Sequence, residues 1–327
     1  MEHRRQALTV GTVVIALAVA IRLLSAGFFG PVAALMRKPD VLSLLMYMET
    51  GRVVRFPGVL PTEPGETEGA TEAPSELPSI PEEESVVTFS QQDLDFVQVQ
   101  YHCSHRPDLE QLLTKSLQWN LKDKEPAVLI LHTHATESYT GDDIDYSSYF
   151  RSLKEDQNML AIGSEIARVL EAGGIHVLHD KTLHDYPNYN GSYDNSRDTI
   201  KAYLQKYPTI RMVLDIHRDA SASTSGQFAT SATVGGEKSA QLMMVVGTKT
   251  AGWEENLALG LKLTALLEQE NPGVCRPIDL RTERFNMDLS PGGMLVEVGA
   301  AGNTRQEALI AANALAQSIL QLAGGSE

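Results

Sequence analysis

The chain contains the stretch Ala127-Val128-Leu129-Ile130-Leu131-His132-Thr133-His134, an apolar run that ends abruptly in two histidines. An uninterrupted apolar run of roughly four to eight residues is typical of a strand that is buried on both faces. Two similar runs occur later, as Val213-Leu214-Asp215-Ile216-His217 and Met294-Leu295-Val296-Glu297-Val298. All three runs carry ionisable groups at or near their ends, which is where open α/β sheets bind ligands.

The segments around these runs alternate between strand-like and helix-like patterns. We expect strands at 127–132, 175–178, 211–216, 241–246 and 294–298, and helices at 158–171, 198–206, 256–269 and 306–322. Gly173 and Gly174 are placed to end one helix, and Thr304 with Glu307 forms a capping-box pair before the last. The pattern predicts an α/β fold in which helices sandwich a single open sheet, mostly parallel or mixed.

The N-terminal part of the chain predicts a membrane anchor over residues 1–30. An apolar run at 7–29, broken by Arg22, follows the basic residues Arg4 and Arg5. A positive flank stays in the cytoplasm, so the rest of the chain is expected outside the cell membrane as the ectodomain of a single-pass protein. A cleaved signal peptide is the alternative, since Ala18 and Ala20 offer a small-x-small site.

Composition divides the remainder into three parts. Residues 31–60 form a juxtamembrane segment whose apolar patch is too short to span a bilayer. Residues 61–86 hold eight glutamates among proline, glycine, serine and threonine, without one basic residue, which predicts an extended linker. Residues 87–327 form the predicted extracytoplasmic domain.

Charge and cysteine content exclude several classes of protein. The net charge is −15, with 27 basic against 42 acidic residues, so a nucleic-acid partner is not expected. The chain has only two cysteines, Cys103 and Cys275, which we expect to be unpaired. A disulfide scaffold and a cysteine-rich zinc site are therefore both excluded.

Two histidines and a carboxylate near neighbouring strand ends are the ligand set of a catalytic zinc site. His134 and His217 are the candidate histidines, and Glu297 adds a carboxylate for proton transfer. A charge inside a strand as apolar as 294–298 is costly to bury without a partner or a purpose.

The carboxylate ligand has two candidates. Glu137 lies three residues after His134 and is preferred, whereas Glu155 precedes a predicted helix, where a solvated charge is also favourable. His132 is expected on the same strand face as His134, because residues two apart in a strand point the same way. It could therefore replace a ligand, support one from behind, or contact substrate.

These residues resemble the stage II sporulation protein P family of endospore-forming bacteria. The resemblance is carried by the segments 132–139, 179–186 and 215–220, and by a final run from Phe285 through Glu297 to Thr304. It implies a zinc-dependent peptidoglycan hydrolase that acts in engulfment, similar to N-acetylmuramoyl-L-alanine amidases and with an endopeptidase activity on cross-links. It also implies membrane-protein partners, including one that cleaves glycan strands.

The resemblance and the residues together suggest roles for individual side chains. Zinc would be held by His134, Glu137 and His217, with Glu297 as general base. Arg218 is expected to stabilise the oxyanion, and Tyr193 and Arg197, in a polar loop, to contact substrate. Two alternatives remain: a non-catalytic peptidoglycan-binding scaffold, and a zinc carboxypeptidase, for which Arg197, Arg281 or Arg284 would bind the terminal carboxylate.

Overall fold

The computed structural model describes residues 87–117, 119–122, 126–141, 150–220, 228–249 and 251–324. Internal contacts separate the chain into units 1–79 and 80–327, and the second is described here. The predicted anchor, juxtamembrane segment and linker lie outside the described residues. Within the described part, no helix is both long and apolar enough to cross a membrane.

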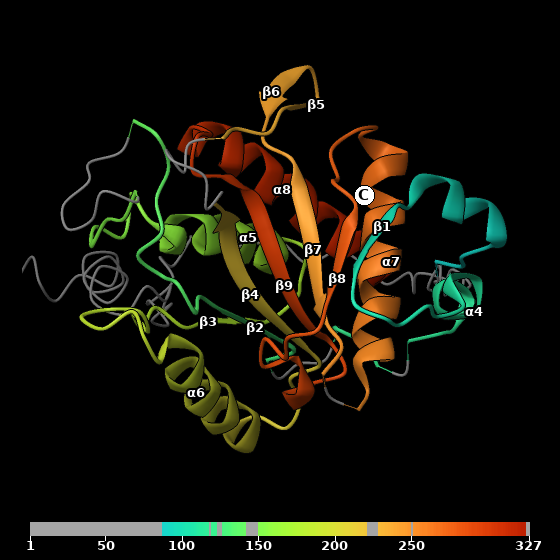
Figure 1. Cartoon of the computed structure of the whole chain (residues 1–327), viewed down its shortest axis with the longest axis horizontal. Coiled ribbons are helices and arrows are strands. Elements are labelled where there is room, and N and C mark those ends of the chain that lie inside the picture. The colour runs from blue at the N-terminus through green and yellow to red at the C-terminus, as the bar shows by residue number, and fades with distance from the viewer. Residues whose placement is uncertain are drawn as a thin grey trace, which may run out of the picture. The chain divides into compact units, whose positions relative to one another are not determined.

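The domain is organised around a seven-stranded mixed sheet of order β1-β8-β7-β9-β4-β2-β3 (Figure 1). Every neighbouring pair is parallel except β7 and β9, so two parallel blocks run in opposite directions. The strands are β1 (Val99–His102), β2 (Val128–Leu131), β3 (Val177–His179), β4 (Met212–Asp219), β7 (Leu242–Gly247), β8 (Ile278–Arg281) and β9 (Gly293–Ala300). A small hairpin, β5 (Ala232–Val234) and β6 (Glu237–Ser239), lies outside this sheet.

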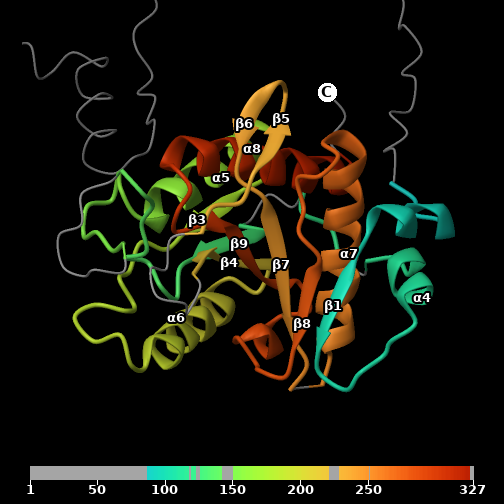
Figure 2. The same ribbon diagram turned by 45° about the horizontal axis from the view of Figure 1, so that its top comes forward.

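Helices cover the two faces of the sheet unequally (Figure 2). One face packs against α5 (Met159–Ala172), α7 (Trp253–Glu270) and α8 (Arg305–Leu322), which together enclose the main hydrophobic core. The other face packs against α6 (Ser192–Lys206), whose Ile200 meets Leu129, Leu131 and Val213 in a smaller cluster. Short helices complete the described part: η1 (Gln91–Phe96), α4 (Leu109–Thr114) and η2 (Met287–Leu289).

Strand register places the functional side chains on the α6 face. Val213 belongs to the α6 cluster, and alternation along β4 puts Asp215, His217 and Asp219 on the same side. Cross-strand pairing extends this face through Glu297, Met243 and Asp279 to the edge strand β1. No described α-helix crosses the β9-β7-β8-β1 half of this face (Figure 1).

The predicted α/β fold with a mixed sheet between helices is confirmed. Thr304 and Glu307 form the expected capping box, and α5 ends at Gly173. Both cysteines are unpaired and half-buried. The prediction missed β1, β5, β6, β8 and α4, and α6 begins six residues earlier than expected, at Ser192 rather than Asp198. Tyr193 and Arg197, which we had placed in a loop, therefore lie on a helix.

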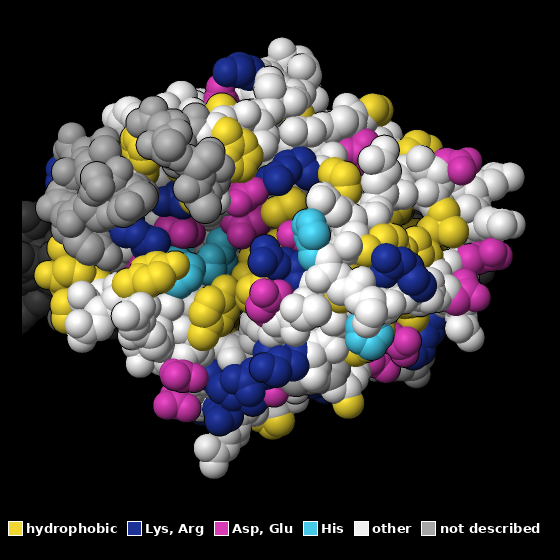
Figure 3. Space-filling view, viewed as in Figure 1, with side chains coloured by type: hydrophobic (Ala, Val, Ile, Leu, Met, Phe, Trp, Pro, Cys, Tyr) yellow, Lys and Arg dark blue, Asp and Glu magenta, His cyan; other side chains and the backbone are white. Residues whose placement is uncertain are grey.

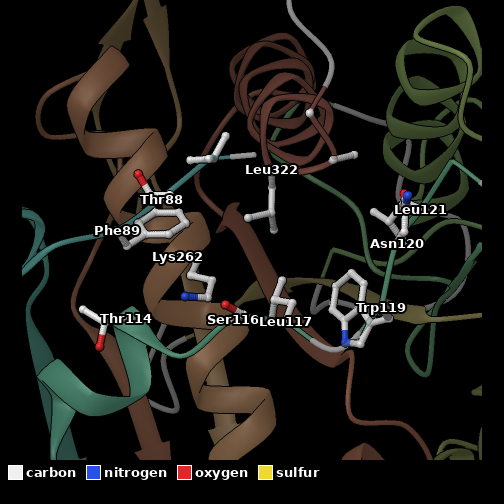
Figure 4. Close-up of a pocket in the computed structure, with 13 residues that line it drawn as sticks. Thr88, Phe89, Thr114, Ser116, Leu117, Trp119, Asn120, Leu121, Lys262 and Leu322 are labelled. Atoms are coloured by element: carbon white, nitrogen blue, oxygen red, sulfur yellow. The ribbon is translucent and has the colours of Figure 1, made fainter. Parts of the chain in front are cut away.

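A cavity of about 390 Å³ lies where the first and last described residues meet, beside α4 and α7 (Figure 4). Phe89, Trp119 and Leu322 contribute to its apolar lining, and Lys262 of α7 is its cation. The Lys262 side chain is buried, donates to the Leu113 carbonyl and lies 4.5 Å from the centre of the Phe89 ring. Burial lowers the pKa of Lys262 to about 8.

Candidate active site

The predicted histidines and carboxylates meet where β2, β4 and β9 lie side by side. His217 and Glu297 pair directly across β4 and β9, so both side chains are on the α6 face. His134 follows β2 in a turn, and its ring centre lies 5.2 Å from that of His217 at a nearly perpendicular angle. Three of the predicted site residues, from distant parts of the sequence, therefore lie together.

Glu137 joins this group from the same turn as His134. Its Oε2 lies 3.7 Å from His217 Nδ1 and 3.3 Å from the backbone nitrogen of Arg218. Its Oε1 lies 3.5 Å from Arg218 and 3.7 Å from Arg151. Burial alone would raise the pKa of this carboxyl, but the nearby positive charges, Arg218 first, outweigh burial and hold the pKa below its usual value. The carboxylate is therefore charged and held by long contacts.

Unpartnered polar atoms mark the centre of the site. Five buried side-chain atoms of the described residues lack a hydrogen bond, and three of them are His134 Nδ1, His217 Nε2 and Glu297 Oε2. His217 Nε2 lies 2.9 Å from Asp215 Oδ1, so the charged form of His217 has an ion-pair partner there. A buried polar atom without a partner is costly, so the presence of two such atoms, on His134 and Glu297, in one place is typical of a binding site.

These residues fit a zinc ion in chemical type. Imidazole nitrogen and carboxylate oxygen are among its usual ligands. His134 and His217 supply two imidazoles, and Glu137 supplies a carboxylate. The described residues contain no group of three histidine, cysteine or acidic side chains gathered closely enough to enclose a metal ion. The three side chains approach only to the distances given above, so ligation would require them to draw together.

Burial and charge set distinct protonation states at the site. Burial lowers the pKa of His134 to about 4, which keeps its ring neutral. Burial also acts on His217, but the negative charges of Asp215 and Glu137 outweigh it and raise that pKa to about 9. Burial raises the pKa of Glu297 to about 8, so this carboxyl exchanges a proton near neutral pH.

Two tyrosines form the wall of the site. Tyr189 stacks on His134 with ring centres 4.5 Å apart, and its hydroxyl lies 3.1 Å from His134 Nε2. Tyr193 sits edge-on to His134 and parallel to His217. Tyr193 was a predicted substrate-contact residue, whereas the sequence did not place Tyr189 beside His134. Figure 3 shows histidine side chains in a hollow of this face, bordered by acidic and basic groups.

The two predicted substrate arginines are engaged in holding the fold. The Arg218 side chain is 2% exposed and donates to the Ser138 and Phe150 carbonyls as well as approaching Glu137. Arg197 forms a two-pronged ion pair with Asp288, at 2.8 and 2.6 Å, which ties α6 to η2. We therefore assign both side chains to positioning the site rather than to contact with substrate.

The structure separates His132 from His134, contrary to expectation. β2 ends at Leu131, so strand alternation does not continue through the turn that carries His134. His132 instead faces α5, where a Cβ on Gly163 would come within 2.6 Å of its ring. Its Nδ1 bonds to the Ile216 carbonyl at 3.0 Å and its Nε2 to His179 at 2.9 Å. His132 is fully buried and its polar atoms are satisfied.

Glu155 lies at the surface and away from the histidines. Its side chain is 64% exposed and forms an ion pair with Lys181 at 3.2 Å. Of the two candidate carboxylates, Glu137 is the one that the fold brings to His134 and His217. Glu155 before α5 therefore matches its simpler interpretation, a solvated charge.

Further buried polar residues hold the turn after β2, and the sequence analysis did not identify them. Asp215 accepts from the backbone nitrogen and hydroxyl of Thr133, at 2.7 and 2.5 Å. Asp185 accepts from the Thr136 hydroxyl and from Arg151, both at 2.6 Å. Asp215 could have been found, because a carboxylate in so apolar a strand requires a partner.

Comparison with known proteins gives a consistent family. Residues 63–320 match the sequence profile of the stage II sporulation protein P family. The chain is 31% identical over 205 residues to stage II sporulation protein P of Bacillus subtilis (strain 168), covering 58% of this chain and 49% of that relative. The chain therefore spans about half the length of this curated relative.

Similar solved structures include N-acetylmuramoyl-L-alanine amidase AmiC2 of Nostoc punctiforme, at TM-score 0.40 and 13% identity, covering 61% of this chain and 98% of that one. The CwlD amidase of Clostridioides difficile, solved in complex with the GerS lipoprotein, matches at TM-score 0.37 and 15% identity, with 61% and 95% covered. The sequence match over most of the described domain, which includes every site residue above, is what assigns the family. The chain belongs to the stage II sporulation protein P family.

Proposed function

We propose that this protein is a peptidoglycan hydrolase of sporulation, and specifically an N-acetylmuramoyl-L-alanine amidase. The observation that carries the proposal is the convergence of His134, His217 and Glu297, of which His134 and Glu297 each have a buried atom that lacks a hydrogen bond. Membership of the stage II sporulation protein P family supports the same activity.

Zinc is the cofactor in this proposal, with His134, Glu137 and His217 as its ligands. Bound there, it would act as a Lewis acid that polarises the substrate carbonyl and activates water. The chain prepares for it in two ways. Burial keeps His134 neutral with a lone pair available, and the acidic surroundings of His217 favour a cation, so that zinc would take the place of the proton that His217 otherwise holds.

Glu297 is the proposed general base and acid. It accepts a proton from the attacking water and returns it to the leaving amine, so that an amide bond is replaced by a carboxylate and an amine. A carboxyl whose pKa lies near 8 suits both directions of transfer at neutral pH. Tyr189 and Tyr193 flank the hollow and would position the substrate against this group.

Mass spectrometry of purified peptidoglycan digested by the full-length protein tests the bond that is cut. We expect stem peptides with a free N-terminal alanine, together with glycan strands whose lactyl groups have lost their peptides. Selective opening of cross-links would instead identify an endopeptidase, and loss of only the terminal residue a carboxypeptidase. An unchanged digest with zinc-loaded protein would favour the non-catalytic scaffold.

We further propose that the protein is anchored by residues 1–30 and works outside the cell membrane with other engulfment proteins, including one that cleaves glycan strands. The apolar run at 7–29 and the acidic linker at 61–86 support this arrangement. Full-length protein should remain in the membrane fraction at high salt while external protease removes the domain after residue 87. A soluble product that begins near residue 21 would instead establish a cleaved signal peptide.

A further inference from the structure

The half of the sheet that no described α-helix crosses on the α6 face forms a cavity of about 300 Å³ beside Glu297. Its floor is made by β9, β7, β8 and β1, and Tyr193 and Phe285 stand at its border. Tyr193 also contacts both His134 and His217. The cavity is therefore continuous with the candidate active site.

Ionised side chains of both signs line the far part of this cavity. Asp279 is buried on β8, and its Oδ1 lies 2.6 Å from His102 Nδ1. Its Oδ2 lies 3.7 Å from Arg281, which is beyond hydrogen-bonding distance. The Arg281 side chain is 44% exposed. Arg281 also donates from its Nε to Glu283 Oε2 at 3.4 Å. The terminal nitrogens of Arg281 and the Oδ2 of Asp279 can each accept a further charged partner.

The register of the sheet gives the distance from the Glu297 carboxyl group to Asp279 and Arg281. Glu297 on β9 and Asp279 on β8 are separated by β7, so they lie two strand spacings apart. Asp279 is level with Val245 and Leu295, and Leu295 lies two residues before Glu297 along β9. With strands about 4.8 Å apart and residues about 3.3 Å apart, the separation is on the order of 12 Å. An extended peptide covers that length in three to four residues, at roughly 3.3–3.6 Å each.

We propose that Asp279 and Arg281 form a subsite for the diamino acid at the third position of the peptidoglycan stem peptide. This inference rests on the proposed function, because it places at Glu297 the amide bond that joins the lactyl group to the first alanine of the stem. The free end of the diamino acid carries an ammonium and a carboxylate, which complement Asp279 and Arg281 respectively. Arg281 provides the two-pronged geometry that carboxylates favour.

Complementary charge of this kind gives specificity more than affinity, since Arg281 is partly solvated. A stem with lysine at the third position keeps the ammonium but lacks the second carboxylate. It would therefore engage Asp279 and leave Arg281 with only its contacts to Glu283 and Asp279. Asp279 and Arg281 are specificity-determining residues in this proposal, and they leave the chemistry at Glu297 unchanged.

Calorimetric titration of the zinc-loaded full-length protein in detergent tests the subsite. The probes are two tripeptides, L-alanyl-γ-D-glutamyl-meso-diaminopimelate and the same peptide with L-lysine at the third position. The wild-type protein should bind the first about tenfold more tightly. Arg281→Gln should remove that preference while leaving lysine-peptide binding unchanged, and Asp279→Asn should weaken both peptides. Arg168→Gln, an exposed arginine of α5, is the matched control and should behave as wild type.

Equal affinity for the two peptides, no measurable binding of either, or a preference that survives Arg281→Gln would overturn the subsite. Binding in this assay requires no turnover, so the proposed function is judged separately by the peptidoglycan digest. A preserved preference without amide cleavage would count against the activity alone. Amide cleavage without the preference would count against the subsite alone.

Discussion

His132 and His134 are two residues apart in the chain and differ sharply in their surroundings. His132 is fully buried against α5, with one ring nitrogen bonded to a backbone carbonyl and the other to His179. His134 lies in the turn beyond β2, between Tyr189 and His217, with a buried Nδ1 that has no partner. Burial lowers the pKa of each to about 4, so protonation state does not distinguish them.

The two histidines differ in how many of their ring nitrogens have a hydrogen-bond partner. A buried group whose hydrogen bonds are complete stabilises the fold and offers nothing to a ligand. A buried group left incomplete raises the free energy of the protein until something binds. Glu297 shares this property with His134, and His217 contacts the His134 ring and pairs with Glu297 across the strands, which is why the three are assigned to chemistry and His132 to the core.

The largest effect that would test this division is expected at Glu297. Glu297→Gln keeps the size of the side chain but cannot accept a proton, so amidase activity should fall by about 10² to 10⁴ fold. The measurement is product release from purified peptidoglycan by protein whose zinc content equals that of the wild type. Near wild-type activity in zinc-replete Glu297→Gln would remove this residue from the mechanism.

Zinc content tests the two histidines directly. His134→Ala should lose the metal, because it removes one of three proposed ligands, whereas His132→Gln should keep it and show only reduced stability. Elemental analysis of the purified proteins, alongside circular dichroism to establish folding, gives the comparison. A folded His132→Gln without zinc, beside a zinc-loaded His134→Ala, would reverse the assignment.

The two carboxylates provide a smaller contrast of the same kind. Glu137→Gln should weaken zinc binding by roughly 10- to 100-fold, because it removes charge from the ligand group, while Glu155→Gln at the surface should leave it unchanged. Competition with a chelator measures both affinities. Selective loss of zinc in Glu155→Gln would show that the segment before α5, and not the turn after β2, supplies the carboxylate ligand.

Much of this architecture was visible in the sequence because it depends on local pattern. The apolar runs at β2, β4 and β9 and the caps of α5 and α8 specify their elements within one or a few residues. β1 was missed because Val99-Gln100-Tyr101-His102 is only four residues long, half of them polar, and none of them is fully buried. The antiparallel pairing of β7 with β9 depends on long-range packing, which no local periodicity encodes.

Site residues were predictable where an ionisable side chain interrupts an apolar strand pattern. They were not predictable where the direction of a side chain depends on the path of the backbone after the strand ends. His134, His217 and Glu297 were identified because charged groups interrupt apolar strands. The face of His132 was predicted wrongly because the alternation rule requires β2 to continue past Leu131, where it stops. Arg218 and Arg197 are charged residues near the site, but only tertiary contacts show that Glu137 and Asp288 engage them.

Gly163 offers a way to disturb His132 without touching His134. A methyl group there would lie 2.6 Å from Nε2 of both His132 and His179, so Gly163→Ala should destabilise the fold by about 1–2 kcal/mol despite the better helix propensity of alanine. Urea unfolding measures this, and zinc content should be unchanged. Gly260→Ala in α7 is the control, because its nearest neighbour is the flexible end of Met294 at 3.3 Å. Equal stability of the two variants would contradict the tight packing at His132.

Lys262 extends the comparison of satisfied and unsatisfied buried groups to a side chain that can carry a charge. It is buried beside two neutral partners, the Leu113 carbonyl and the Phe89 ring. Its pKa is about 8 in the folded protein against an ordinary 10.5, so between these values the unfolded chain binds a proton that the folded protein does not. Stability contributed by this group therefore rises as pH increases from 8 to 10.5.

Lys262→Met removes the charge while keeping an unbranched apolar chain. It should raise the free energy of unfolding by about 1 kcal/mol at pH 7, since the carbonyl bond and the ring contact offset part of the desolvation cost. The advantage of the variant should shrink toward pH 10, because the wild-type lysine is then already neutral when folded. Urea unfolding of both proteins at pH 7, 8.5 and 10 measures the difference in their free energies of unfolding. The other titrating groups are the same in both proteins, so their contributions cancel in this difference. A variant less stable than wild type at pH 7 would mean that the carbonyl and the aromatic ring fully satisfy the ammonium, so that Lys262 belongs with His132 among the groups that stabilise the core.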